Sequence, residues 1–407
     1  MLSEDSLDNL TQPIIDRQEA INLYIIQKIA KRVNEIGKVK KSDIKRLASL
    51  RSSGADVQEI NKELAKMTSL QVKDIKALIR VVALTEYLDT KAFFDYRHKK
   101  FIPYSKNDML RRRIESIARQ TSNTYINMSK AQAFMIRDLK NPSVLIPTSI
   151  AKTYQSIVDE AIQAITGGTV DYNTAMRRTI NQLADSGLRR VTYNPESGRR
   201  YTQRMDTAVR RNILDGVRKV YQGMQDIVGE QFGADGVEIS VHMNPAPDHA
   251  AMQGHQYTKA EFANMQNAED FKDVQGRHYE GFERAVGTLN CRHFAISIVI
   301  GATKQNYTDA QLQRILDQNE AGYTMPNGKH LTMYECTQYQ RKLETKIRYA
   351  KDNQIAARAA GDMTEAKKYQ AKINDLTKEY EKFSAACGLS PKKSKMTVKG
   401  YHKIKAS

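Results

Sequence analysis

The chain has 407 residues, of which 40% are hydrophobic and 27% charged, a balance that is typical of a folded protein and excludes a disordered one. Its 64 Lys and Arg outnumber 46 Asp and Glu, and the formal net charge of +18 favours a polyanionic partner, either nucleic acid or an acidic protein surface. The three cysteines are too few for a disulfide framework and indicate folding in a reducing cytosol, and no apolar run is long enough for a membrane-spanning helix.

Residues 1–229 are predicted to form a helical N-terminal region. From Leu70 to Leu88 the apolar residues keep the spacing of a helix that buries one face, and those from Ile14 to Ile29 do much the same. Prolines predict breaks near 100–106 and 141–147, and the turn cluster 193–200 predicts another. Apart from such breaks, we expect residues 13–220 to be helical.

Residues 230–305 are predicted to form a small α+β module. The segment Gly236–His242 alternates apolar and polar residues, as a half-buried strand does, and His293–Ile300 is apolar and β-branched. The two segments predict a small sheet.

Residues 306–388 are predicted to be helical again. Six apolar residues step by three and four along the chain and predict one seam of an antiparallel helical hairpin with its turn near Gly361 (Ala366, Tyr369, Ile373, Leu376, Tyr380 and Phe383). Residues 389–407 form a basic tail, with six Lys and no acidic residue, which we expect to be mobile. The predicted fold class is therefore α+β and predominantly α.

Basic residues gather in three stretches, at 27–51, at 177–219 and in the tail. Arginines 204, 211 and 218 repeat every seven residues, so one helical face would present them as a stripe. The residues predicted to contact double-stranded DNA or an acidic protein partner are Arg204, Arg211, Arg218, Lys392, Lys393 and Lys395.

Two short segments of the module are dense in polar and metal-ligating side chains, PDHAAMQGH at 247–255 and GTLNCRH at 287–293. We expect them to converge at one end of the small sheet as a structural polar cluster, in which Asp248 pairs with Arg292 (Asp248, His249, Gln253, Gly254, Asn290, Cys291, Arg292 and His293). In this interpretation the protein has no cofactor.

Two other interpretations of the same residues involve chemistry. His249, Cys291 and His293 are the residue types that bind zinc, with His255 or Asp248 available as a fourth ligand. Alternatively, Cys291 would be a nucleophile with His249 or His293 as its base. No phosphate-binding loop, dinucleotide-binding motif or metalloprotease motif is present, and the sequence predicts a protein that is not an enzyme.

The sequence resembles the phage minor capsid protein 2 family of tailed bacteriophages. The resemblance rests on PAPDHAAMQG at 245–254, on GTLNCRH at 287–293 and on the helical segment that begins with Tyr334-Glu335-Cys336-Thr337-Gln338. It is also similar to the wider group of Mu-type minor head proteins, whose corresponding motif usually ends in Cys-Arg-Cys where this chain has His293.

The resemblance implies a virion component of the phage head, made in the cytoplasm of the bacterial host and associated with the portal region. Such a protein would assist head assembly, DNA packaging or delivery, and its partners would be the portal protein and the major capsid or scaffolding protein. The competing hypothesis is a metal-dependent or toxin-like enzyme domain within residues 236–301.

Overall fold

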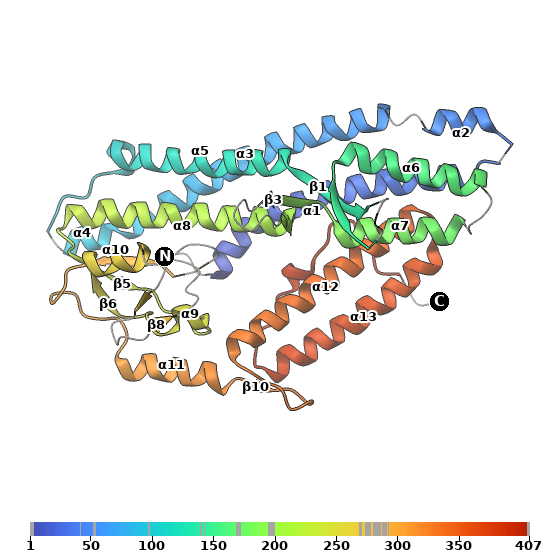
Figure 1. Cartoon of the computed structure of the whole chain (residues 1–407). Coiled ribbons are helices and arrows are strands. Elements are labelled where there is room, and N and C mark those ends of the chain that lie inside the picture. The colour runs from blue at the N-terminus through green and yellow to red at the C-terminus, as the bar shows by residue number, and fades with distance from the viewer. Residues whose placement is uncertain are drawn as a thin grey trace.

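The computed structural model describes residues 4–404 except 41, 52–53, 97, 139–140, 142, 168–171, 194–199, 268–270, 273–277, 280–285, 287–290 and 292. Its architecture is mostly helical with small antiparallel sheets (Figure 1), and the predicted fold class is confirmed. In the described part of the chain, no helix combines the length and the apolar character needed to cross a membrane.

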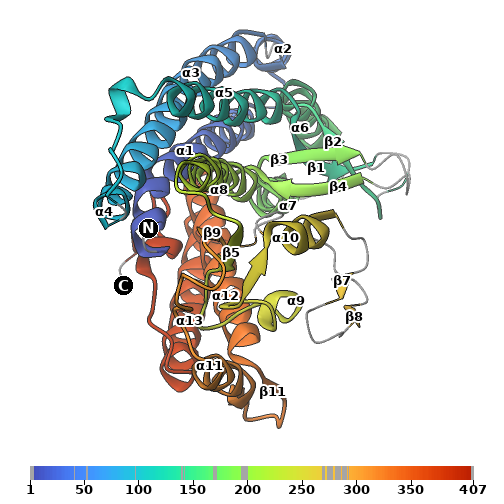
Figure 2. The ribbon, with the colours of Figure 1, turned by 90° about the vertical axis from the view of Figure 1, so that its left-hand side faces the viewer.

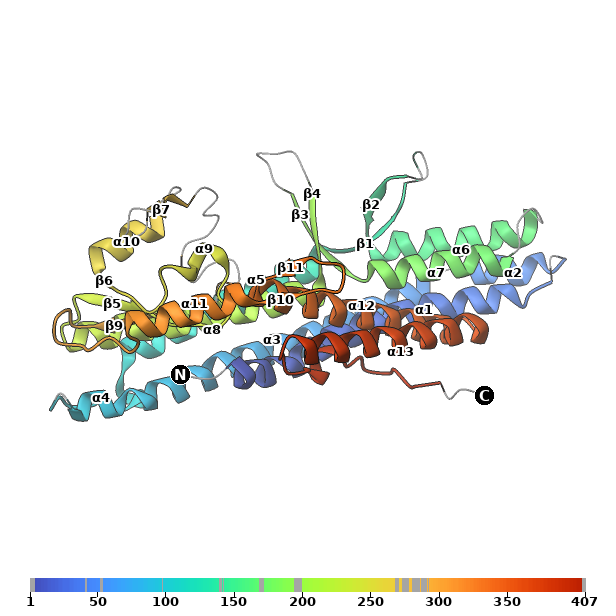
Figure 3. The ribbon, with the colours of Figure 1, turned by 90° about the horizontal axis from the view of Figure 1, so that it is seen from below.

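Long helices run side by side through the N-terminal region and share one large core (Figure 3). They are α1 (Glu4–Gly37), α3 (Gly54–Asp89), α5 (Asp108–Lys130) and α8 (Met205–Gln231), accompanied by the shorter α2 (Ile44–Arg51), α4 (Lys91–Tyr96), α6 (Ile150–Gly167) and α7 (Tyr172–Ser186). Gly216 of α8 sits where three helices meet, because a Cβ there would lie 2.5 Å from Oγ1 of Thr121 on α5 and 3.1 Å from Cδ1 of Ile79 on α3. A side chain at position 216 would therefore push the helices apart.

A four-stranded antiparallel sheet interrupts these helices, and the expectation of helices throughout residues 13–220 is wrong at this point. The strands are β1 (Gln132–Arg137), β2 (Leu145–Thr148), β3 (Arg189–Tyr193) and β4 (Arg200–Arg204), in the order β2-β1-β3-β4. Pro147 pairs with Met135 in the edge strand β2, where a missing N–H is tolerated. The strands are short, and β3 and β4 each carry two arginines, so local pattern does not reveal them. β1 pairs with β2 and β3 with β4 as hairpins, and the pairing of β1 with the distant β3 joins them into one sheet.

The module of residues 230–305 contains the two predicted strands, although each is shorter than predicted and the first is buried on both faces instead of half-buried. They are β5 (Gly236–Ile239) and β9 (Ala295–Ile298), and they pair antiparallel in a sheet of order β6-β5-β9 with β6 (Gln256–Thr258). The other described elements are α9 (Pro247–Ala250), α10 (Lys259–Asn267), β7 (Phe271–Lys272) and β8 (His278–Tyr279). The sheet packs on the C-terminal end of α8, where Oγ of Ser297 donates to the backbone oxygen of Gln225 at 2.8 Å.

The C-terminal region forms the predicted helical hairpin (Figure 2). It consists of α12 (Met333–Ala359) and α13 (Met363–Ala386), preceded by α11 (Asp309–Ala321) and the short strands β10 (Tyr323–Thr324) and β11 (His330–Leu331). Gly361 makes the turn with a φ of +78°, in the left-handed region that favours glycine. Leu343 and Ile347 of α12 lie in one core with Tyr380 and Phe383 of α13, as the seam predicts.

Residues 389–404 of the basic tail pack against the rest of the protein, which differs from the predicted mobility. Met396, in the short 3₁₀ helix η2 (Lys393–Met396), and Val398 are buried. The ammonium of Lys351 donates to the backbone oxygen of Met396 at 2.6 Å, and the backbone N–H of Ile404 donates to Oε1 of Gln370 at 2.9 Å. The tail therefore covers one side of the hairpin.

Candidate functional site

A pocket of about 870 Å³ lies where the three regions meet. Its walls come from α1 and α8 of the N-terminal region, from residues 241–246 of the module, and from α12 with the start of the tail. His249, Cys291 and His293 of the module also border it. Segments that are far apart in the sequence thus meet around one opening.

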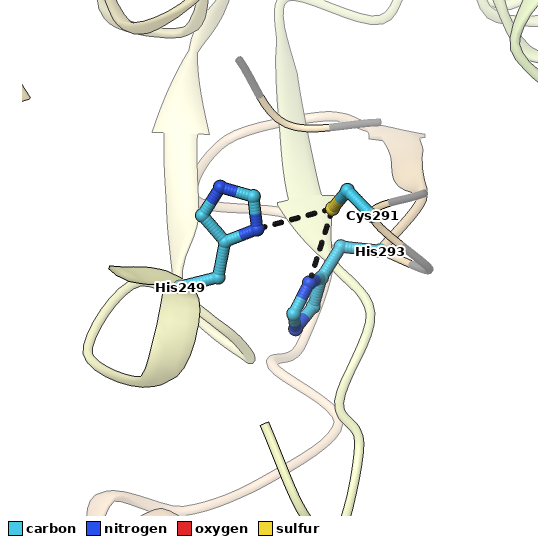
Figure 4. A group of neighbouring side chains, drawn as sticks. All are labelled: His249, Cys291 and His293. Atoms are coloured by element: carbon cyan, nitrogen blue, oxygen red, sulfur yellow. Dashed lines mark hydrogen bonds between the residues drawn. The ribbon is translucent and has the colours of Figure 1, made fainter. Parts of the chain in front are cut away.

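His249, Cys291 and His293 form a compact cluster (Figure 4). Sγ of Cys291 lies 3.1 Å from Nδ1 of His249 and 3.4 Å from Nδ1 of His293. The ligand-type atoms of the three side chains all lie within 4.8 Å of one another, and all three side chains are buried. His249 comes from the short helix α9, whereas Cys291 and His293 come from the segment that leads into β9.

Gln253 and Gly254 support this cluster from the turn that follows α9. Oε1 of Gln253 lies 3.2 Å from Nε2 of His293 and accepts a hydrogen bond from the backbone N–H of His242 at 2.8 Å. Gly254 has a φ of +75°, and its N–H donates to the backbone oxygen of Ile239 at 2.8 Å. The turn at Gly254 therefore fixes Gln253, and Gln253 fixes the orientation of the His293 ring.

The other residues expected in the cluster are only partly described. Asn290 and Arg292 and the side chain of Asp248 lie outside the described residues, and with them the predicted Asp248–Arg292 pair. His255 is described but does not join the cluster, and its backbone oxygen accepts from the N–H of Ile239.

Most charged side chains on the pocket wall are basic. The wall residues with basic side chains are Arg210, Arg211, Arg341, Arg348, Lys392 and Lys395, and those with acidic side chains are Glu19, Asp206 and Glu344. Of the residues predicted to contact a polyanion, Arg211, Lys392 and Lys395 lie on this wall, Lys393 is exposed, and Arg218 is half-buried. Burial lowers the pKa of the Arg218 guanidinium from its usual value.

Arg204 is not part of a surface stripe, and its interpretation as a contact for an outside partner is wrong. The side chain is 6% exposed, and its guanidinium bonds Asp352 at 3.0 Å and Asp206 at 3.4 Å. Its guanidinium carbon also lies 4.4 Å from the ring centroid of Tyr349. The seven-residue spacing fails because Arg204 precedes the first turn of α8 and is directed toward α12.

Arg204 belongs to a buried ion network that the sequence did not reveal. Arg348 of α12 donates to Glu19 of α1 at 2.8 Å and to Asp206 of α8 at 2.7 Å, so the network joins three helices. Although burial acts to raise the pKa of Asp206, Arg204 and Arg348 hold it at about 2. The only local signal was a set of charged residues, such as Glu19, within otherwise apolar helix faces.

Comparison with known proteins gives a family for the chain. No curated protein and no solved structure matches it. A model of the family described as phage minor capsid protein 2 matches residues 2–384, which include all three regions and both motif segments. The chain therefore belongs to the phage minor capsid protein 2 family.

Proposed function

We propose that this minor capsid protein is a structural component of the phage head that associates with the portal region and assists head assembly, DNA packaging or delivery. The observation that carries the proposal is the family match across residues 2–384. A structural head protein binds other head proteins through its surface. The net charge of +18 is complementary to acidic surfaces on such partners.

Contact with double-stranded DNA is the second part of the proposal. Lys393, Lys399 and Lys403 of the tail are exposed, as are Lys38 and Lys40 after α1. Lysines of this kind suit contact with phosphates that does not depend on base sequence. Much of the arginine-rich stretch is bound within the protein instead, since Arg177 donates to Asp362 at 2.6 Å in addition to the Arg204 network.

Pairwise binding experiments test the portal assignment. The tagged full chain is mixed separately with the portal, major capsid and scaffolding proteins of the same phage, at low and at high salt. We expect selective retention of the portal protein, with weaker binding at high salt because charged surfaces are screened. Retention of the capsid protein alone would move the proposed position away from the portal.

The enzyme hypothesis for residues 236–301 is favoured by one observation, the position of the His249, Cys291 and His293 cluster on a pocket wall. Phage carrying Cys291→Ser distinguishes it from a purely structural role. If the module is an enzyme, heads should assemble with normal amounts of the variant but should infect poorly. A structural role for the cluster predicts instead that the variant is lost from the heads.

A further inference from the structure

We propose that His249, Cys291 and His293 bind one Zn²⁺ ion, whose fourth coordination position opens to the pocket between the three regions. This metal site is independent of the head function proposed above. Imidazole nitrogen and thiolate sulfur are the ligands that zinc prefers in proteins. In the described part of the chain these three residues are the group of ligand-type side chains that meets the geometry of a metal site.

The distances fit an ion of this size. Zinc binds sulfur at about 2.3 Å and imidazole nitrogen at about 2.0–2.1 Å, so sulfur and nitrogen ligands in a tetrahedron are about 3.5 Å apart. Sγ of Cys291 lies 3.1 Å from Nδ1 of His249 and 3.4 Å from Nδ1 of His293. The ligand atoms of all three side chains lie within 4.8 Å of one another, so the imidazole rings must turn to bring both nitrogens within bonding distance of the ion.

The hydrogen bond of His293 to Gln253 places the ring proton on Nε2, and Nδ1 is then the nitrogen that would bind a metal. Oε1 of Gln253 accepts the backbone N–H of His242, so this end of the amide is an acceptor, and it lies 3.2 Å from Nε2 of His293. Nε2 must therefore carry the proton and donate it, which leaves Nδ1 with a lone pair that faces Cys291. A ligating histidine typically donates its other N–H to such a neighbour.

An ion would hold the three side chains at one point, whereas hydrogen bonds of the thiol join them in pairs. The S–H of Cys291 has one proton and can donate to only one of the two Nδ1 atoms at a time. A zinc ion would instead bind the thiolate and both nitrogens together. The three side chains are 0–7% exposed, so the ion would lie largely within the protein.

The position of the cluster indicates what the ion would do. Two of the ligands precede β9 and the third lies on α9, so the ion would join segments that are 42 residues apart in the sequence. Three protein ligands leave one position of a tetrahedron open, which is the arrangement of zinc sites that exchange a ligand. Because the pocket wall carries more basic than acidic side chains, a water molecule or an anionic group would occupy that position.

Metal content of the full chain tests the proposal. Protein purified without chelators should contain about one zinc per chain, and Cys291→Ser and His293→Gln should each reduce the content severalfold. Cys387→Ala is the matched control, because it removes another buried thiol in a different core and should keep the zinc.

Cobalt replacement gives a second measurement that does not depend on the folding of the variants. Metal-stripped wild-type protein titrated with Co²⁺ should develop the absorption of a thiolate-bound tetrahedral ion, and added Zn²⁺ should remove it. Wild-type protein that keeps its helical circular dichroism, yet contains far less than one zinc per chain and shows no cobalt–thiolate absorption, would overturn the proposal.

Discussion

At the scale of single residues, the buried ion network between α1, α8 and α12 contains more acidic than basic side chains. Two guanidiniums, of Arg204 and Arg348, face three carboxyl groups, of Glu19, Asp206 and Asp352. Burial raises the pKa of Glu19 to about 7 against the attraction of Arg348, and burial also raises the pKa of Asp352. A proton on Glu19 makes the network neutral, so pH acts on the fold through this carboxyl group.

The first prediction concerns that proton. An unfolded chain releases it near pH 4.5 and the folded chain near pH 7, so Glu19 should make the protein less stable as pH rises through this interval, by about 1–3 kcal/mol. Glu19→Gln, which cannot ionise, should match the wild type in urea unfolding at pH 5 and exceed it at pH 8. Equal stability of both proteins at the two pH values would contradict the raised pKa.

The second prediction separates the two roles considered for arginine. Arg204→Gln leaves Asp206 and Asp352 without one of their cations in a buried site and should lower the free energy of unfolding by about 3–5 kcal/mol. Arg211→Gln is the matched control on the next helical turns and should change stability little, because Arg211 is half-buried on the pocket wall. Chemical denaturation of both variants checks this, and a stable Arg204→Gln protein would refute the structural role.

At the scale of elements, α12 contacts both the other helix of the C-terminal hairpin and the N-terminal helices. Its first half packs against α13, and Asp352 and Arg348 connect it to the N-terminal helices. A capping box starts the helix, in which Oγ1 of Thr332 accepts from the N–H of Glu335 at 3.2 Å and Oε2 of Glu335 accepts from the N–H of Thr332 at 2.9 Å. The start of α12 is therefore set locally, whereas its orientation is set by distant residues.

The third prediction tests the seam of this hairpin. Ile347 is fully buried in the core that α12 shares with Tyr380 and Phe383, so Ile347→Ala should leave a cavity and cost about 2–5 kcal/mol. Lys346→Ala, the exposed neighbour, should cost far less. Thermal unfolding of the two variants gives the comparison. Similar melting temperatures would contradict the burial of Ile347 in the seam between α12 and α13.

The fourth prediction concerns the tail as an element. Val398 is buried against Leu23 and Ile355, and Met396 is buried in the hairpin core, so deleting residues 389–407 should destabilise the protein. Burial of each of these two side chains contributes about 1.5–3 kcal/mol. Replacing Lys393, Lys399 and Lys403 with Gln keeps the buried residues and should leave the melting temperature close to that of the wild type. If the deletion variant has the same melting temperature as the wild type, the tail does not pack on the hairpin as described.

At the scale of the whole molecule, membership in a phage capsid family places the protein in the virion among other head proteins. Its positive charge is divided between two uses. Arginines such as Arg204 and Arg348 bind carboxylates inside the protein, whereas lysines of the tail and of the segment after α1 face outward. The net charge is therefore not a measure of the charge that a partner meets.

The fifth prediction follows from that division. Each phosphate contact should lower the logarithm of DNA affinity by about 0.9 per decade of salt. Gln at Lys393, Lys399 and Lys403 should thus reduce both the affinity and the salt slope in filter binding, while the variant remains folded. If the wild type retains no duplex DNA even at about 50 mM salt, where this electrostatic contribution should be strong, the exposed lysines serve protein contacts instead.

The sequence by itself determined the elements whose pattern is local. The spacing from Leu70 to Leu88, the seam of α13 and the pattern at Gly236 depend on neighbours a few residues away, and the structure has a helix, a packed hairpin and a strand there. The predicted burial differs in part, because Leu70, Leu84 and Leu88 are exposed and β5 is buried on both faces. The motif residues at 245–254 and 287–293 likewise indicate the family through their order along the chain, and the family match confirms it. Local periodicity and short motifs need no knowledge of distant contacts.

Only the tertiary structure decided the features that depend on distant partners. The hairpins β1–β2 and β3–β4 join into one sheet because β1 pairs with β3, which follows α6 and α7 in the sequence, and Arg204 is buried because Asp352, 148 residues away, receives its guanidinium. The tail is ordered because Val398 meets a surface made by α1 and α12. In each case the stabilising contact is made with a residue far away in the sequence. The pattern of neighbouring residues therefore cannot predict it.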